Sequence, residues 1–327
     1  MTDKRDERTC PYGWNLSEAL KLSVSCRGCF GNQGCTQSIF HTFQRILEKI
    51  EFFMKTELLK LVNELHWFTN QINFEIEEEG KSFINYISDF TGKEEFPFPI
   101  IDYGNRPLYR AVNYFQDNSM YKQKKHFWLA PIDLIPVGRL NFRKEEVFYC
   151  SEEIGTAIAE ISVGSESKYP ASIKVKPNRN LRLISMGLGN KYSTISNGIT
   201  YTTREKALDI FIRDKFRQKI DPEEESKYFA TAIIANLFLP NKSIDGIIYP
   251  SCSTNLLGEN IGLKKEILGE SLVFEEVRTY EMVSKKSDFD FKVKCLQKAS
   301  DKENGEYNWE PIKNCKNHII NQKMYLE

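Results

Sequence analysis

The sequence lacks an excess of charge of either sign, and it lacks long apolar runs. Lysine plus arginine and aspartate plus glutamate both number 45 in 327 residues, so the formal net charge is zero. Without surplus positive charge, little counterion release is available to drive polyanion binding, which argues against nucleic acid as a partner. No 18 consecutive residues are apolar, so no contact with a membrane is expected. The charged start, Met1 to Arg8, precedes no apolar segment, and we expect an unexported, cytoplasmic protein.

Cysteine is scarce as well. Eight cysteines in a chain of this length are too few for a disulfide scaffold and favour a reducing compartment. Cys26 and Cys29 have the spacing of a zinc knuckle, and Cys10 and Cys35 could complete a structural tetrahedral zinc site, with His41 as a substitute ligand. A second pair with this tight spacing is missing. Reduced thiols in a loop before a helix are therefore an equally good interpretation.

Several motifs of nucleotide and nucleic-acid chemistry are absent. The glycines in Met186 to Asn190 lack the third glycine of a dinucleotide fingerprint and the Gly-Lys-Ser/Thr of a P-loop. An RNase would need an arginine followed closely by a histidine on one helix, and neither His41 nor His66 has one. A thiol nucleophile is not expected at Cys252, which has no histidine or acidic partner in the sequence.

The first third of the chain has helical periodicity. Apolar residues recur at helical spacing from Thr36 to about Leu65, which predicts a long amphipathic helix. Its apolar stripe needs partners, and Ser17 to Ser25 and Lys81 to Phe90 are the candidates. The stretch Gly92 to Pro99 contains two prolines and is typical of a linker. The sequence therefore predicts a small helical domain over residues 1–97.

Beyond the linker, short β-like runs alternate with helical runs. Strands are expected at Pro107 to Val112, Val147 to Tyr149, Ala171 to Val175 and Ile244 to Tyr249. Helices are expected at Ile154 to Ile161, Arg204 to Phe211 and Lys227 to Leu239. This pattern predicts a mixed α/β (α+β) domain over residues 98–296, with one or two last strands between Tyr280 and Cys295. A polar, mobile stretch from Lys298 to Tyr307 would begin a polar tail over residues 297–327.

Three segments of this domain carry polar residues where an apolar strand or helix ends. The first is Leu108-Tyr109-Arg110-Ala111. The second runs from Gly138-Arg139-Leu140-Asn141 through Val147–Ser151 to Ala157-Ile158-Ala159-Glu160. The third is Asp245–Ser251, and Gly258-Glu259-Asn260 follows it. In this order the segments resemble the RES family, named after an arginine, a glutamate and a serine, and the resemblance covers about Pro99 to Val283.

The resemblance implies a fold akin to ADP-ribosyltransferases, an HEPN-like helical N-terminal extension, and a toxin-like bacterial enzyme that consumes NAD. It also implies an antitoxin or other regulatory partner, and a homodimer. By the aligned motifs it assigns catalytic roles to Glu160, Arg110, Ser251 and Tyr149. It assigns NAD-binding roles to Arg110, Arg139, Tyr109, Asn141 and Asn260. The stretch between Glu160 and Ser251 is longer than the family pattern, which leaves the rim of the pocket undefined.

The chemistry of these residue types is compatible with cleavage of a nicotinamide glycosidic bond. Positive charge develops on the ribose, and the Glu160 carboxylate could stabilise it without a catalytic metal. Arg110 and Arg139 suit a pyrophosphate, Tyr149 could stack on the nicotinamide, and Ser251 could fix the ribose or the glutamate. Each residue type alone is more often a surface, turn or packing residue. Hydrolysis, phosphorolysis, ADP-ribosyl transfer to a protein and a non-catalytic interaction module all stay open.

Overall fold

The computed structural model describes residues 33–73, 77–92, 98–113, 123, 125–162, 169–188, 202–287, 290–301, 307–312 and 318–320. The chain divides into two units, one ending at Glu57 and one beginning at Leu58. This boundary differs from the expected one at residue 97. The boundary lies earlier because residues 58–91 pack within the second unit.

The long helix that the apolar spacing predicted is α2 (Gln33–Gln71), and α3 (Glu77–Thr91) is one of its two expected partners. The other expected partner, Ser17 to Ser25, lies outside the described residues. Val62 and Leu65 of α2 are buried in one apolar cluster with Phe83 and Ile87 of α3. The same cluster includes residues of α6 (Thr203–Arg217), α7 (Phe229–Asn236) and the sheet.

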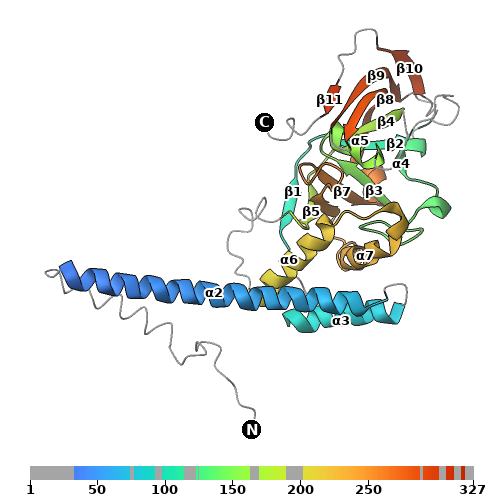
Figure 1. Cartoon of the computed structure of the whole chain (residues 1–327). Coiled ribbons are helices and arrows are strands. Elements are labelled where there is room, and N and C mark those ends of the chain that lie inside the picture. Colours follow the sequence, from blue (N-terminus) through green and yellow to red (C-terminus); the bar gives the residue numbers. More distant parts are fainter. Residues whose placement is uncertain are drawn as a thin grey trace. The chain divides into compact units, whose positions relative to one another are not determined.

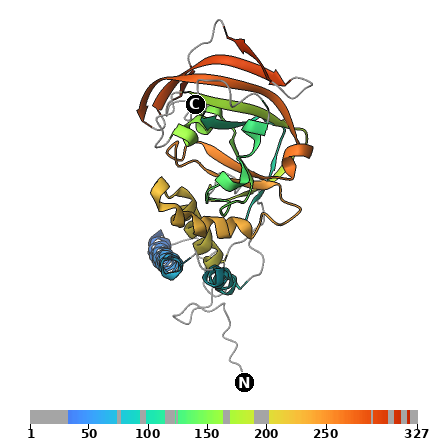
Figure 2. The same ribbon diagram turned by 90° about the vertical axis from the view of Figure 1, so that its right-hand side faces the viewer.

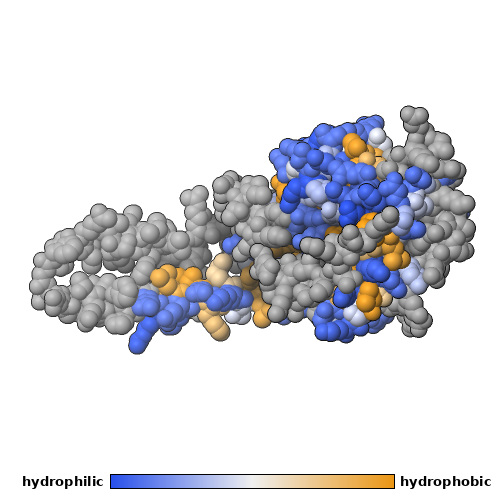
Figure 3. All heavy atoms as spheres, turned by 90° about the horizontal axis from the view of Figure 1, so that it is seen from above, coloured by the Kyte–Doolittle hydropathy of each residue, from blue (hydrophilic) through white to orange (hydrophobic). Residues whose placement is uncertain are grey.

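In the first unit, the apolar side chains of α2 are largely exposed. Orange apolar patches are visible on this helix in Figure 3. The exposed set consists of Ile46, Leu47, Ile50, Phe52, Phe53 and Met54. Among the described helices, none combines the length and the apolar character that crossing a bilayer requires.

The described strands form one mixed sheet (Figure 1). The strands are β1 (Ile100–Tyr103), β2 (Leu108–Asn113), β3 (Val147–Ser151), β4 (Pro170–Pro177), β5 (Leu181–Ser185), β6 (Gly246–Pro250), β7 (Glu259–Lys264), β8 (Leu272–Ser287), β9 (Asp290–Asp301), β10 (Tyr307–Pro311) and β11 (His318–Ile320). Their order is β1-β5-β6-β7-β3-β2-β4-β8-β9-β10, and β11 pairs with β9. The pair β5 and β6 is parallel, and the other described pairs are antiparallel.

The sheet curves around an apolar core (Figure 2). Leu183 on β5, Phe148 on β3 and Ala299 on β9 belong to one buried cluster, although their strands are far apart in the sheet order. On another side, α5 (Ile154–Ser162) packs Ile158 against a cluster that contains Phe291 and other residues of β8 and β9. The sheet is therefore a curved platform with helices packed on it, and the helix α5 lies against the strands β2, β3 and β4.

The strands and helices expected in the α/β domain are present, with shifted bounds. The run at Arg204 to Phe211 extends to Arg217, and Thr202 begins it with a capping box to Glu205. The run at Lys227 to Leu239 is corrected. It consists of a 3₁₀ helix, η4 (Pro222–Tyr228), followed by the α-helix α7, which ends at Asn236. Short helices α4 (Lys125–Trp128), η2 (Ile132–Leu134) and α8 (Ile267–Glu270) complete the described elements.

The C-terminal part differs most from expectation. The strand β9 continues to Asp301, through the point where a mobile polar tail was expected to begin, and β10 and β11 both pair with it. Tyr307 is buried and stacks on Phe274, with ring centroids 5.6 Å apart, whereas Asn308 is exposed. Among the described residues of β9 and β10, solvent-facing side chains alternate with packed ones, and this is why these strands are polar in sequence.

The close approach of β6 and β7 gives a stability prediction. A Cβ on Gly246 would lie 2.3 Å from the backbone oxygen of Gly262 and 2.9 Å from Leu263 Cδ2. We therefore expect Gly246→Ala to lower the free energy of unfolding by about 2 kcal/mol, as overpacked cores do. Gly269→Ala is the control, because a Cβ there meets no atom within 4 Å, and it should leave stability unchanged or slightly higher. Urea titration measures both, and equal stability of the two variants would contradict the prediction.

Candidate active site

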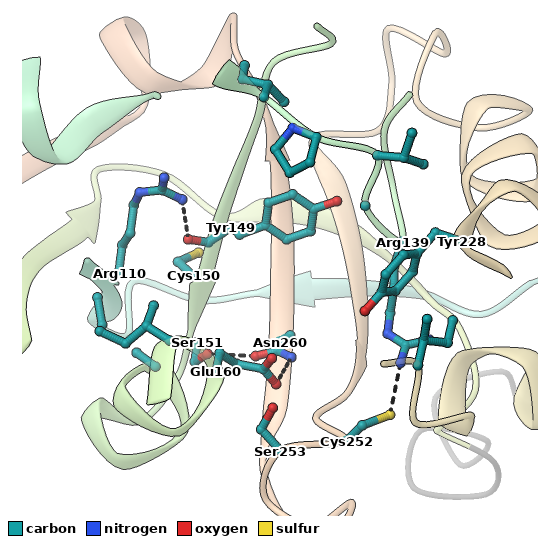
Figure 4. Close-up of a pocket in the computed structure, with 18 of the residues that line it drawn as sticks. Arg110, Arg139, Tyr149, Cys150, Ser151, Glu160, Tyr228, Cys252, Ser253 and Asn260 are labelled. Carbon is teal, nitrogen blue, oxygen red and sulfur yellow. Dashed lines mark hydrogen bonds between the residues drawn. The ribbon is translucent and has the colours of Figure 1, made fainter. Parts of the chain in front are cut away.

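A cavity of about 720 Å³ is lined by residues of β2, β3, β6, β7, α5, the 133–143 segment and η4. Its size is within the usual range of small-molecule sites. Most residues that the sequence singled out line it (Figure 4). These are Tyr109, Arg110, Arg139, Tyr149, Glu160 and Asn260. Asn141 and Ser251 are buried next to the wall, and each bonds to a lining residue.

One side of the cavity is organised around the Glu160 carboxylate at the end of α5. Its Oε1 accepts hydrogen bonds from Ser251 Oγ and from Asn260 Nδ2, each at 2.6 Å. Asn260 is oriented in turn, because its Oδ1 accepts from Ser151 Oγ at 2.8 Å. The structure shows no hydrogen bond to Oε2 and no ion pair of Glu160 among the described residues. Neutral donors thus fix the carboxylate and leave its negative charge uncompensated.

Small residues let α5 come close to these strands. Thr156 is fully buried, and a Cβ on Gly258 would lie 2.1 Å from its Oγ1. Glycine at 258 is therefore required for the approach of α5 to the loop between β6 and β7. That loop carries Ser251, whose Oγ also accepts from the backbone N–H of Thr254 at 3.3 Å. The residues of α5 that precede Glu160 are mostly buried, and Glu160 itself is exposed to the cavity.

Arg110 on β2 provides a positive charge on the same cavity. Its Nη1 donates to the backbone oxygen of Tyr149 at 3.0 Å, and its guanidinium lies over the Phe148 ring at 5.3 Å. Its Nε is buried and without a hydrogen-bond partner. Burial lowers the pKa of Arg110, and no carboxylate pairs with it among the described residues. A half-buried cation in this state favours an anionic ligand.

Arg139 is engaged differently. It is buried, its Nη1 donates to Lys215 O at 3.3 Å, and its Nη2 donates to Gln218 O at 2.5 Å. The same Nη2 lies 3.2 Å from the sulfur of Cys252. Arg139 therefore binds the C-terminal end of α6, whose last carbonyl groups lack partners within the helix. The expectation of two equivalent arginines that clamp a pyrophosphate does not match this geometry, because most Arg139 donors already have protein acceptors.

Tyr149 holds the wall that carries Arg139. Its hydroxyl donates to Asn141 Oδ1 at 2.6 Å and accepts from the backbone N–H of Leu140 at 2.9 Å. Burial raises its pKa, so the phenol stays protonated. Asn141 Nδ2 donates to the backbone oxygens of Pro136 and Phe142. Asn141 is thus bonded inside the loop and is not a lining residue, which differs from the binding role expected for it.

The structure adds lining residues that the sequence did not single out. Tyr228 and Glu225 come from η4, and Cys252 follows Ser251. Burial raises the pKa of the Cys252 thiol, which disfavours the thiolate that a nucleophile needs. Of these three residues, only Cys252 could have been found from the sequence, because it directly follows the motif residue Ser251. The sequence around Tyr228 has no pattern that would mark a site.

The zinc prediction falls mainly outside the described residues. Cys10, Cys26 and Cys29 lie there, and so does the side chain of Cys35. Within the described ranges, no group of three or more histidine, cysteine, aspartate or glutamate side chains is arranged to hold a metal ion.

The combination of curved mixed sheet, strand-end arginine and helix-end glutamate defines a small-molecule site of mixed charge. Comparison with known protein families identifies it further: residues 107–266 match the RES domain. The chain thus contains a RES domain over these residues, and a helical region precedes it. RES domains are known from NAD-degrading toxins of toxin–antitoxin pairs. No curated protein matches the chain.

Two tyrosines of the cavity wall give a matched prediction. Tyr149→Phe removes the partner of the Leu140 N–H and of Asn141 Oδ1, and we expect it to lower the free energy of unfolding by about 1–3 kcal/mol. Among the described residues no hydrogen bond to the Tyr109 hydroxyl is present, so Tyr109→Phe should change stability by less than about 0.5 kcal/mol. Thermal and urea unfolding of both variants test this. A Tyr149→Phe protein as stable as Tyr109→Phe would show that the hydroxyl does not hold the loop.

Proposed function

We propose that the protein cleaves the bond between nicotinamide and ribose in NAD. The observation that carries the proposal is the pairing of unlike charges across one cavity. Arg110 has no carboxylate partner among the described residues, and Glu160 is a carboxylate held by neutral donors alone. NAD has the complementary pattern, because its pyrophosphate is anionic and its ribose becomes cationic when nicotinamide leaves.

The proposed step needs no group beyond these residues and a nucleophile. The bond between ribose C1′ and the pyridine nitrogen breaks, and its electron pair stays on the nitrogen, so nicotinamide leaves neutral. Positive charge spreads over C1′ and the ring oxygen, and the Glu160 carboxylate stabilises it. Water then adds to C1′ through its oxygen and releases one proton to the solvent, which gives ADP-ribose. Ser251 and Asn260 act as positioning residues, since they fix Oε1 of Glu160.

The proposal predicts the effect of neutralising the glutamate. Glu160→Gln keeps an acceptor oxygen for Ser251 and Asn260 but removes the charge, so nicotinamide release should fall by about 100-fold or more. Glu48→Gln, on an exposed part of α2, is the charge-matched control and should keep full activity. Chromatographic nicotinamide assays of the purified proteins measure both. Undiminished release by Glu160→Gln would remove the basis for the mechanism.

The same assay distinguishes the related reactions. With water as the nucleophile the second product is ADP-ribose, with phosphate it is phosphorylated ADP-ribose, and with a protein side chain it is a modified protein of increased mass.

RES toxins generally pair with antitoxins, and an NAD-consuming enzyme must be restrained in its host. We therefore propose that an antitoxin-like partner binds this protein.

A second prediction concerns Arg110. Arg110→Gln should weaken ADP-ribose binding by about 10- to 100-fold, which corresponds to the loss of hydrogen bonds to a charged group. Arg106→Gln is the control, because Arg106 is exposed and pairs with Glu152 at 3.1 Å, away from the cavity lining. Isothermal calorimetry with ADP-ribose measures both dissociation constants. Equal affinities for the two variants would place the anion elsewhere.

A further inference from the structure

The part of the cavity wall that η4 supplies lies between Glu160 and Ser251 in the chain, outside the segments on which the resemblance to the RES family rests. From this element, Glu225 and Tyr228 line the cavity. Neither residue belongs to the motifs of the family. Their side chains nevertheless bond to, or stack on, a motif segment, and this makes them part of the site of this chain.

Glu225 fixes the segment that precedes Arg139. Its Oε1 accepts a hydrogen bond from the backbone N–H of Val137 at 2.7 Å, and its Oε2 pairs with Arg143 Nη2 at 2.7 Å. One carboxylate thus holds the loop at two points, on either side of Arg139. The loop and η4 form a single wall as a result, and Tyr228 has a defined place in it.

Tyr228 stands beside Arg139 on that wall. The Arg139 guanidinium lies 5.3 Å from the centre of the Tyr228 ring, a favourable cation–π distance. The side chain is half-buried, and its hydroxyl has no hydrogen-bond partner among the described residues. Figure 4 shows this hydroxyl pointing away from η4, into the space between the Arg139 and Glu160 sides of the cavity. A half-buried hydroxyl aimed at a cavity is a donor that a ligand can use.

Arg139 has fewer N–H groups left to donate to a ligand. Arg139 already donates to Lys215 O, Gln218 O and the Cys252 sulfur. Burial and the nearby Glu160 charge raise the pKa of Tyr228, so its hydroxyl keeps its proton near neutral pH. The wall therefore combines a fixed positive charge with a neutral, protonated donor in front of it. This combination suits an anionic oxygen.

We propose that Tyr228 is a substrate-binding residue whose hydroxyl donates a hydrogen bond to a pyrophosphate oxygen of the dinucleotide. The inference rests on the proposed function and deepens it. Arg139 supports this contact through the ring rather than by direct donation, and Arg110 on β2 would contact the ligand from another part of the cavity wall. The dinucleotide is thus held by one guanidinium and one phenol.

Tyr228→Phe tests the contact, because it keeps the ring over Arg139 and removes only the hydroxyl. We expect the dissociation constant of ADP-ribose to rise about 5- to 10-fold, in line with the loss of one hydrogen bond. The constant for ADP should rise by the same factor, since ADP retains the pyrophosphate. The KM for NAD should rise while kcat changes less than 2-fold, and the melting temperature should stay within about 1 °C.

Tyr86→Phe is the matched control. It removes a hydroxyl that donates to Glu64 at 2.9 Å in the helical layer, outside the cavity lining, and should leave ligand affinity unchanged. Weaker ADP-ribose binding with unchanged ADP binding would place the contact on the terminal ribose and overturn the inference. Wild-type affinity in Tyr228→Phe, with intact nicotinamide release, would overturn it and leave the proposed function standing. A wild-type protein that neither binds ADP-ribose nor releases nicotinamide would overturn both.

Discussion

The site depends on how one carboxylate is held. Oε1 of Glu160 accepts from Ser251 and Asn260, residues 91 and 100 positions away in the chain. Both donors are neutral, so they orient the carboxylate without forming an ion pair, whereas an arginine or lysine partner would have formed one. A fixed, uncompensated negative charge has an electrostatic cost in the free protein. In the proposed reaction, the positive charge that develops on the ribose would offset this cost.

The orientation of Asn260 toward Glu160 depends on the register of the strands β3, β6 and β7. Asn260 lies opposite Ser151 on β3 and opposite Tyr249 on β6, so three strands determine which way its side chain points. A shift of one residue in either pair would turn Asn260 to the other face of the sheet and leave Glu160 without a donor. Gly258 is also required for this orientation of Glu160, because only a residue without a Cβ allows α5 to come this close. The site is therefore a consequence of pairing and packing, and not of a flexible loop.

How much of this could be predicted from the sequence depends on how local the signal is. The strand with Arg110, the helix with Glu160 and the strand before Ser251 were predicted, because apolar periodicity and turn residues are local. The strands β1, β5 and β7 were not predicted, and β1 follows directly on the stretch Gly92 to Pro99 that was interpreted as a linker. The last strands were taken for a polar tail because their solvent-facing residues dominate the composition. The bond between Ser251 and Glu160 was one of two options that residue chemistry allowed, and only the fold distinguishes them.

The two arginines show the limit of residue type as a guide. Both were expected to hold an anion, and both line the cavity, but their surroundings differ. The charge of Arg139 is partly balanced by carbonyl oxygens at the C-terminal end of α6, whereas Arg110 has one backbone acceptor and a buried Nε without a partner. The demand for an anion is therefore stronger on the β2 side than on the α6 side. If the proposed function holds, Arg110 would attract an anionic part of the ligand more strongly than Arg139 does, and Tyr228 would supply the neutral donor on the Arg139 side.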